Sequence, residues 1–248
     1  MIAKGSAVMI SYKTLENTSI EVLQQAFVKA FSDYQVKIDM PVSKLALMLK
    51  RRGYDPEISI GAFDDEMLVG FVLNGLRNWN GEQTAYDTGT GVIREYRKQG
   101  ITSRMISNTM KLFDKNGISQ YLLEVIQANT AALRLYQKQG FKISRDLLCF
   151  QIDRDKYEPA ASYKTERIDN IDQTLWTQLK AFWDVKPSWQ NSIDSINAVQ
   201  DAFLYSIIHI DGKIAGYGII EKATGDIPQL AVDKDYRHRK VASSILAD

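Results

Sequence analysis

Apolar and polar residues alternate along the chain in blocks that are typical of helices and strands in turn. Up to Asp155, apolar residues recur three or four positions apart, as on one face of a helix, in residues 19–31, 42–51, 101–115 and 130–139. Short apolar runs bounded by polar turns predict strands at residues 9–12, 58–63, 67–76, 85–93, 121–126 and 141–152. This alternation predicts a mixed α/β domain.

A second, shorter series of the same kind follows a polar stretch that contains Pro159. It comprises a helical pattern at residues 174–182, two apolar runs at 203–210 and 213–221 around a turn, and a strand pattern at 229–232. We therefore expect a complete first domain over residues 1–154, a linker over 155–163 and a second, partial domain over 164–248.

An internal repeat connects the two series. The tripeptide Glu95-Tyr96-Arg97 and its counterpart Asp235-Tyr236-Arg237 each follow a predicted strand and open a predicted helix. After the first tripeptide the pattern continues through another strand and another helix, whereas only a few residues follow the second. The sequence therefore predicts an incomplete second copy, in a chain that is truncated or incompletely recorded.

Composition argues against several kinds of function. Lys and Arg number 31 and Asp and Glu number 30, so the net charge of +1 lacks the strong positive excess of nucleic-acid-binding domains. One cysteine, Cys149, and two histidines rule out a disulfide framework and argue against a metal site. No apolar run approaches the roughly 18 residues of a membrane span. We expect a cytoplasmic protein with no metal, nucleic-acid or membrane partner, and with Cys149 in the core.

The turn between the predicted strand 85–93 and the predicted helix 101–115 carries two basic residues and a glycine, Arg97, Lys98 and Gly100. The first N–H groups of a helix have no partner within the helix and bind phosphate groups, and glycine lets a ligand approach the backbone closely. The same pattern is also typical of a solvated helix start. By itself it leaves both interpretations open.

A second segment with functional character spans residues 129–141. Asn129 suits the N-cap of a helix, and Gly140 suits the position just past its end. Ala132, Leu135 and Tyr136 lie at positions i, i+3 and i+4, and this spacing places Tyr136 on the buried face of the predicted helix.

Taken together, the two segments resemble the motifs of the GNAT acyltransferase superfamily. The first motif, Arg/Gln-x-x-Gly-x-Gly/Ala, is matched by Arg97 and Gly100, with Thr102 in the place of the last small residue. The second, Asn-x-x-Ala-x-x-Leu-Tyr-x-x-x-Gly-Phe, is matched at every specified position by Asn129, Ala132, Leu135, Tyr136, Gly140 and Phe141. The resemblance covers residues 9–153. It implies the GNAT fold, a central, mostly antiparallel twisted sheet that is flanked by helices and split in a V between strands four and five.

The resemblance also implies an enzyme that transfers an acetyl group from acetyl-CoA to a primary amine of a small molecule or peptide. The pyrophosphate of coenzyme A would lie against the basic turn and the start of the helix, formed by Arg97, Lys98, Gln99, Gly100, Ile101, Thr102, Ser103 and Arg104. The pantetheine arm would pair with the strand edge and pass the second motif, at Gly91, Val92, Ile93, Asn129 and Ala132. A backbone N–H near Val92 would stabilise the oxyanion that develops on the thioester carbonyl.

In this resemblance Tyr136 would protonate the departing thiolate, because a phenol with an ordinary pKa of about 10 stays protonated at neutral pH. The general base stays open between Asp87, Glu124 and a water relay. Phe31, Asp33 and Tyr34, at the end of the first helix, occupy the region where the superfamily builds its acceptor site.

Two other functions are compatible with the same residues: a non-catalytic acyl-CoA-binding or regulatory module, and a transferase for a longer acyl or an aminoacyl group. In the second copy Lys240 replaces the central glycine of the first motif. We therefore expect the second copy to be a partial GNAT-like domain that is structural or acceptor-binding, not an independent acyl-CoA site. A homodimer and the identity of the amine are left open by the sequence.

Overall fold

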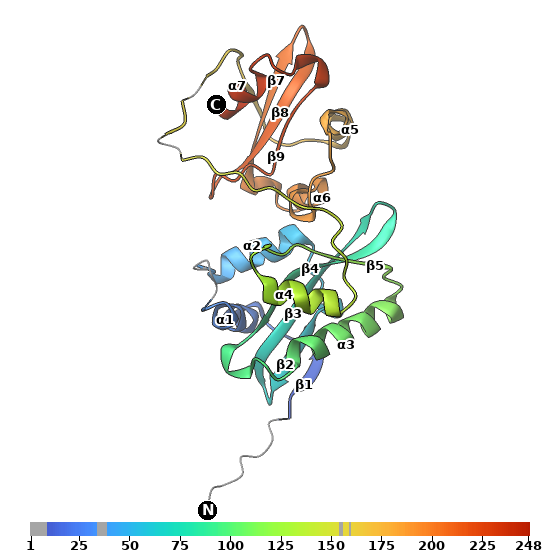
Figure 1. Ribbon diagram of the computed structural model, residues 1–248. Helices are drawn as coiled ribbons and strands as arrows, with labels where there is room; N and C mark the ends of the chain where they lie inside the picture. Colours follow the sequence, from blue (N-terminus) through green and yellow to red (C-terminus); the bar gives the residue numbers. More distant parts are fainter. Residues whose placement is uncertain (1–8, 34–38, 154–155, 159) are drawn as a thin grey trace, which may run out of the picture. The chain divides into compact units, whose positions relative to one another are not determined.

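The computed structural model describes residues 9–33, 39–153, 156–158 and 160–248. The chain divides into two units, Met1–Ser144 and Arg145–Asp248, each with its own sheet (Figure 1). Among the described residues, none of the helices has both the length and the apolar character needed to cross a membrane.

The first unit is built on a five-stranded sheet. Its strands are β1 (Ser11–Thr14), β2 (Ile60–Asp64), β3 (Met67–Trp79), β4 (Glu82–Val92) and β5 (Gln120–Leu123), hydrogen-bonded in the order of the sequence. The pairings from β1 to β4 are antiparallel, and β4 and β5 are parallel. This arrangement confirms the predicted mixed α/β fold with a mostly antiparallel sheet.

Helices cover both faces of this sheet (Figure 1). On one face, α1 (Ile20–Ala30) and α2 (Val42–Arg52) pack against Phe71 and Leu73 of β3. On the other, α3 (Ile101–Asn116) packs against Val72, and α4 (Thr130–Lys138) adds two side chains to the same cluster. Because successive strand residues point to opposite faces, β3 supplies both cores at once.

The pairing between β4 and β5 ends halfway along β4. Their last paired residues are Asp87 and Leu123, whereas β4 continues to Val92 and pairs there only with β3. Next to this fork, Leu73 pairs with Gly89 and Asn74 with Asp87, so Thr88 is an extra residue on β4. Such a β-bulge bends the strand and redirects the side chains beside it.

The prediction of closing strands over residues 141–152 is wrong, because this segment forms neither a strand nor a helix. From Ile143 on its apolar side chains are exposed, with Phe150 91% and Leu148 81% accessible, and Cys149 is exposed as well, not in the core. Alternation of apolar and polar residues produces a strand only where a neighbouring strand accepts its hydrogen bonds. Within the described part of the chain, β5 is the last strand of its sheet and pairs with β4 alone.

The second unit contains a four-stranded antiparallel sheet. Its strands are β6 (Glu166–Ile168), β7 (Phe203–Ile210), β8 (Lys213–Glu221) and β9 (Gln229–Val232), again in the order of the sequence. Side chains from α5 (Gln173–Leu179) and α6 (Ile193–Asn197) pack with Ile207 on one face, and α7 (Val241–Leu246) packs with Ile208 on the other. Trp176 and Trp189 are both 1% exposed, as expected for core residues.

In the first unit, the arginine of the first motif holds the end of β4 to the end of α1. The Nε atom of Arg97 donates to the Val92 carbonyl at 3.0 Å, and its Nη2 donates to the Ala30 carbonyl at 2.7 Å. Both Nη atoms also donate to the carboxylate of Asp33, at 2.6 and 2.8 Å. We call this set of contacts the arginine clamp.

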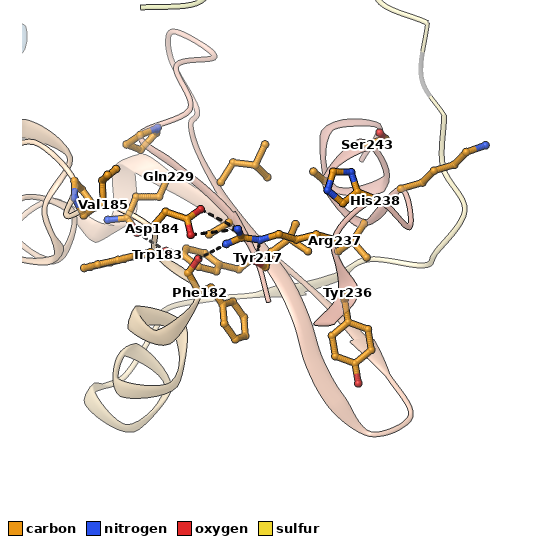
Figure 2. A pocket seen from close by; sticks show the side chains of 18 residues that line it. Phe182, Trp183, Asp184, Val185, Tyr217, Gln229, Tyr236, Arg237, His238 and Ser243 are labelled. Carbon is orange, nitrogen blue, oxygen red and sulfur yellow. Dashed lines mark hydrogen bonds and ion pairs between the residues drawn. The ribbon is translucent and has the colours of Figure 1, made fainter. Parts of the chain in front are cut away.

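The second unit contains the same clamp. Arg237 donates through Nε to the Val232 carbonyl at 3.1 Å and through Nη2 to the Phe182 carbonyl at 3.0 Å, and its Nη1 lies 2.9 Å from the carboxylate of Asp184 (Figure 2). The turn that follows is also repeated, because the positive φ angles of Lys98 (62°) and Gly100 (75°) recur at His238 (61°) and Lys240 (64°).

We predict that Arg97→Met lowers the free energy of opening of the first unit by about 1–3 kcal/mol, because it leaves the buried carbonyls of Ala30 and Val92 without their donor. Asp33→Asn should have a smaller effect, since Arg97 keeps both carbonyls and the Asp33 carboxylate is solvated. Hydrogen–deuterium exchange of β4 peptides measures the difference. Arg237→Met is the matched control and should accelerate exchange in β9 only. Equal exchange in β4 of the Arg97→Met and Asp33→Asn proteins would contradict the prediction.

Candidate active site

The carboxyl group of Asp87 lies at the fork between β4 and β5 and is folded back onto its own strand. One carboxyl oxygen accepts the backbone N–H of Gly89 at 2.9 Å, and the other accepts the hydroxyl of Thr90 at 2.7 Å. Asp87 is only 8% exposed. The bulge at Thr88 makes this possible, because it brings the carboxyl group back over the residues that follow it.

Tyr136 reaches the same carboxyl group from α4. Its hydroxyl donates to Oδ2 of Asp87 at 3.0 Å. The helix is positioned by its own ends: the side chain of Asn129 accepts the N–H of Ala132 at 3.2 Å, and Gly140 follows the helix with a φ of +95°. The structure thus brings two of the three predicted catalytic residues into direct contact.

Burial raises the pKa of Asp87, because a charged carboxylate loses its hydration there. The hydrogen bonds from Thr90, Tyr136 and Gly89, and the positive charge of Arg52, oppose this shift. A buried carboxyl group whose pKa is raised is suited to accept and release a proton during a reaction. The neighbouring Tyr121 stays protonated, since burial raises its pKa well above the ordinary value.

Glu124, the third predicted catalytic residue, lies one residue past the end of β5 and is exposed. The strand predicted over residues 121–126 ends earlier, at Leu123, because its pairing with β4 stops at the fork. Glu124 acts electrostatically on Arg52, whose cationic form it favours. Its role as a base stays a prediction.

The free edge of β4 presents a backbone donor beside the fork. The N–H of Ile93 donates to the Val69 carbonyl of β3 at 2.9 Å. Successive N–H groups of a strand point to opposite sides, so the N–H of Val92 faces away from β3, toward the side that β5 has left. Gly91 lies in the same stretch of β4, which has no neighbouring strand on that side among the described residues, although Arg97 donates to the Val92 carbonyl there.

The turn after β4 leads into α3 with an open approach to the backbone. Gly100 has a left-handed conformation, and a Cβ atom placed on it would meet nothing within 4 Å. The N–H groups of Ile101, Thr102 and Ser103 are in the first turn of α3, where helical partners are missing. The N–H of Arg104, in contrast, donates to the Gly100 carbonyl at 3.1 Å, so this backbone donor, which was expected to hold the pyrophosphate, is already paired within α3.

Of the predicted acceptor-binding residues, two are described. Phe31 packs against Phe27 and Phe71, with ring centroids 4.7 and 6.3 Å apart. Asp33 belongs to the arginine clamp, and the contact with Arg97 lowers its pKa while raising that of Arg97. Tyr34 lies outside the described residues.

Two residues of the site were not expected from the sequence, Thr90 and Arg52. Thr90 follows Asp87 by three positions, a short-range pattern that also occurs in loops and helix starts. Arg52 belongs to a run of basic residues at the end of α2, and nothing in that pattern distinguishes it from a solvated end of a helix.

The second unit contains a cavity of about 650 Å³ beside its own arginine clamp (Figure 2). It is lined by aromatic residues, by basic residues and by residues of β9, among them Trp183, Tyr217, Gln229, His238 and Lys240. Since Arg237 and Val232 correspond to Arg97 and Val92, the counterpart of Asp87 is Ile227, which lies before β9. Within the described residues of either unit, no group of His, Cys, Asp and Glu side chains is arranged to hold a metal ion.

Comparisons with known proteins give matches to part of the chain. N-alpha-acetyltransferase 30 of Schizosaccharomyces pombe is 28% identical over 87 residues, 35% of this chain and 58% of that protein. N-alpha-acetyltransferase MAK3 of Arabidopsis thaliana is 24% identical over 124 residues, 50% of this chain and 65% of that protein. The chain therefore spans less than two thirds of the length of these relatives.

Among solved structures, one match is the crystal structure of the NatC complex bound to Gag peptide and CoA, with 19% identity and a TM-score of 0.46 over 55% of this chain and 86% of the matched chain. The family model that matches is that of the Acetyltransferase (GNAT) family, over residues 21–141. This stretch runs from α1 to the Gly140-Phe141 pair that ends the second motif. Residues 21–141 of the chain therefore form a GNAT-family acetyltransferase domain.

Proposed function

We propose that this protein is an N-acetyltransferase that uses acetyl-CoA and transfers its acetyl group to a primary amine by direct attack on the thioester. The hydrogen bond between Tyr136 and Asp87 at the fork of β4 and β5 is the observation that carries the proposal. It joins an acid and a base beside the edge of β4 that faces away from β3, and the N–H of Val92 is directed from that edge. Direct transfer needs no enzyme nucleophile, which fits a chain with one cysteine and two histidines.

The residues at the fork and at the start of α3 fit acetyl-CoA. When bound, it supplies an activated acetyl group whose thioester carbonyl takes on negative charge during transfer. The N–H of Val92 would stabilise that charge, and the unpaired edge of β4 would hold an amide-containing arm in the manner of an added strand. The open backbone around Gly100 and the first N–H groups of α3 would hold phosphate groups.

Asp87 and Tyr136 provide a balanced path for the proton. Asp87 takes the proton of the amine as the nitrogen–carbon bond forms and the carbon–sulfur bond breaks. Tyr136 donates its hydroxyl proton to the departing sulfur and regains a proton from Asp87 along the existing hydrogen bond. The proton of the amine thus ends on the thiol, and both side chains return to their starting states.

The acceptor class to be tested first is the α-amino group of a peptide. The names of both relatives, which are N-alpha-acetyltransferases, support this choice. A non-catalytic acyl-CoA-binding module and a longer acyl donor are the alternatives. Dimer formation and a cytoplasmic location stay predictions.

We further propose that the second unit is a GNAT-like copy that does not bind acetyl-CoA by itself. The repeated arginine clamp and the repeated turn conformation support common architecture. The isoleucine at position 227, where the repeat places the counterpart of Asp87, and the lysine in place of Gly100 argue against the same chemistry. A structural or acceptor-binding role fits these differences.

Tyr136→Phe should lower kcat by roughly 10- to 100-fold and leave the affinity for acetyl-CoA nearly unchanged, because it removes one proton donor but keeps the packing on Phe141. Release of free thiol from acetyl-CoA with a panel of peptides and small amines measures kcat. Calorimetric titration measures affinity. If the wild-type protein binds acetyl-CoA but releases no thiol with any acceptor, the binding-module alternative is correct.

The pH dependence of kcat/KM should show an acidic limb above the ordinary carboxyl pKa of about 4, because burial raises the pKa of Asp87. Activity should rise with pH as this carboxyl group loses its proton. Asp87→Asn should abolish the limb and lower activity by about 100-fold or more. Glu124→Gln is the control, and loss of the limb in that variant would assign the base to Glu124.

Acetyl-CoA should slow hydrogen–deuterium exchange in peptides that cover the turn 97–104, through direct contact with its backbone. It should leave peptides of the corresponding turn, residues 237–244, unchanged. Mass-spectrometric exchange with and without acetyl-CoA makes the comparison within one sample. Equal protection of both turns would overturn the proposed difference between the two copies.

A further inference from the structure

Arg52, the last residue of α2, contacts the bulge of β4. Its Nη1 donates to the carbonyl of Thr88 at 2.6 Å. Thr88 is the extra residue of the bulge and is 4% exposed. A bulged residue is left outside the regular ladder of strand hydrogen bonds, so its buried carbonyl needs a donor from elsewhere. Arg52 supplies that donor directly next to Asp87.

The base of the Arg52 side chain is fixed to the sheet. Immediately after α2, the N–H of Asp55 donates to the Asn74 carbonyl at 2.8 Å, and the N–H of Leu76 donates to the Gly53 carbonyl at 3.0 Å. The contact requires a glycine on β3, because a Cβ atom on Gly75 would lie 2.2 Å from the carbonyl oxygen of Arg52. The guanidinium group therefore extends from a rigid position.

The charge of Arg52 acts on the proposed base. It opposes the effect of burial on the pKa of Asp87, and burial lowers the pKa of Arg52 itself without removing the charge. Hydroxyl groups from α4, β4 and β5 also lie near the carboxyl group of Asp87. The titratable and polar groups that face Asp87 are Arg52 from α2, Tyr136 from α4, Tyr121 from β5, and Thr90 and the N–H of Gly89 from β4.

We propose that Arg52 is a positioning residue, which pins the bulge at Thr88 and favours the ionised form of Asp87, the form that can accept the proton of the amine. This inference rests on the proposed function, in which Asp87 is the base. Arg52 acts through Thr88 and Asp87, and not by contact with the reacting atoms.

The test is the pH dependence of kcat/KM in Arg52→Met. Loss of the cation disfavours the charged form of Asp87, so the acidic limb should move to higher pH by roughly half a unit to one unit. At the plateau, kcat should fall about tenfold, because the bulge loses its anchor, while KM for acetyl-CoA changes little. Arg52→Lys keeps the charge but loses the planar fork, and its acidic limb should stay near that of the wild type.

Arg77→Met is the matched control. The Nη2 of Arg77 donates to the Arg51 carbonyl at 2.6 Å, so its loss loosens the same end of α2 without removing the contact with the bulge. Its acidic limb should coincide with that of the wild type. An acidic limb of Arg52→Met that coincides with the wild type, or one that moves equally in Arg77→Met, would refute the positioning role.

A second measurement separates failure of this inference from failure of the proposed function. Carboxyl carbon NMR follows the titration of Asp87 in the absence of any substrate, with Asp87→Asn assigning the signal. The titration midpoint should rise in Arg52→Met even if no acceptor is acetylated. An unchanged midpoint would refute the inference, whereas a shifted midpoint in a protein that releases no thiol would refute only the proposed function.

Discussion

Strand β4 has no parallel neighbour after Asp87. The rest of the candidate site depends on which groups form hydrogen bonds with the backbone of β4 beyond that point. Where β5 is absent, three side chains make hydrogen bonds with backbone groups of β4. Arg52 donates to the carbonyl of the bulge, the Asp87 carboxyl group folds back onto its own strand, and Arg97 donates to the carbonyl of Val92. The N–H of Val92 remains directed at the open side, where an extended amide-containing ligand can take the place of a strand.

The arginine clamp occurs in both units, and a comparison of the two units distinguishes shared structural contacts from the residues of the candidate site. Arg97 and Arg237 each join a strand end to a carbonyl and a carboxylate of a preceding element, with nearly the same distances. The clamp therefore stabilises a strand-turn-helix unit irrespective of what that unit does. The buried carboxyl group of Asp87 and its hydroxyl partner from α4 distinguish the first unit, and function resides in such additions to a common framework.

Much of the first unit could be predicted from local patterns. The periodicity placed α1, α3 and α4 within two residues of their observed ends, and Asn129 and Gly140 cap α4 as expected. The same reasoning failed for residues 141–152, where alternating apolar residues have no paired strand and are exposed. Apolar alternation reports that a segment can become a strand, but the hydrogen bonds that make it one come from another part of the chain.

The amino-acid sequence by itself determined the elements of the first unit, the caps of α4 and the two motifs, because these depend on residues within a few positions of each other. The contacts that make a site depend on residues far apart: Tyr136 and Asp87 are 49 positions apart, Arg52 and Thr88 are 36 apart, and Arg97 and Asp33 are 64 apart. Only the tertiary structure decided that Asp87 is buried against Tyr136 while Glu124 is exposed, since the fork of β4 and β5 encloses one carboxyl group and leaves the other beyond the last paired residue.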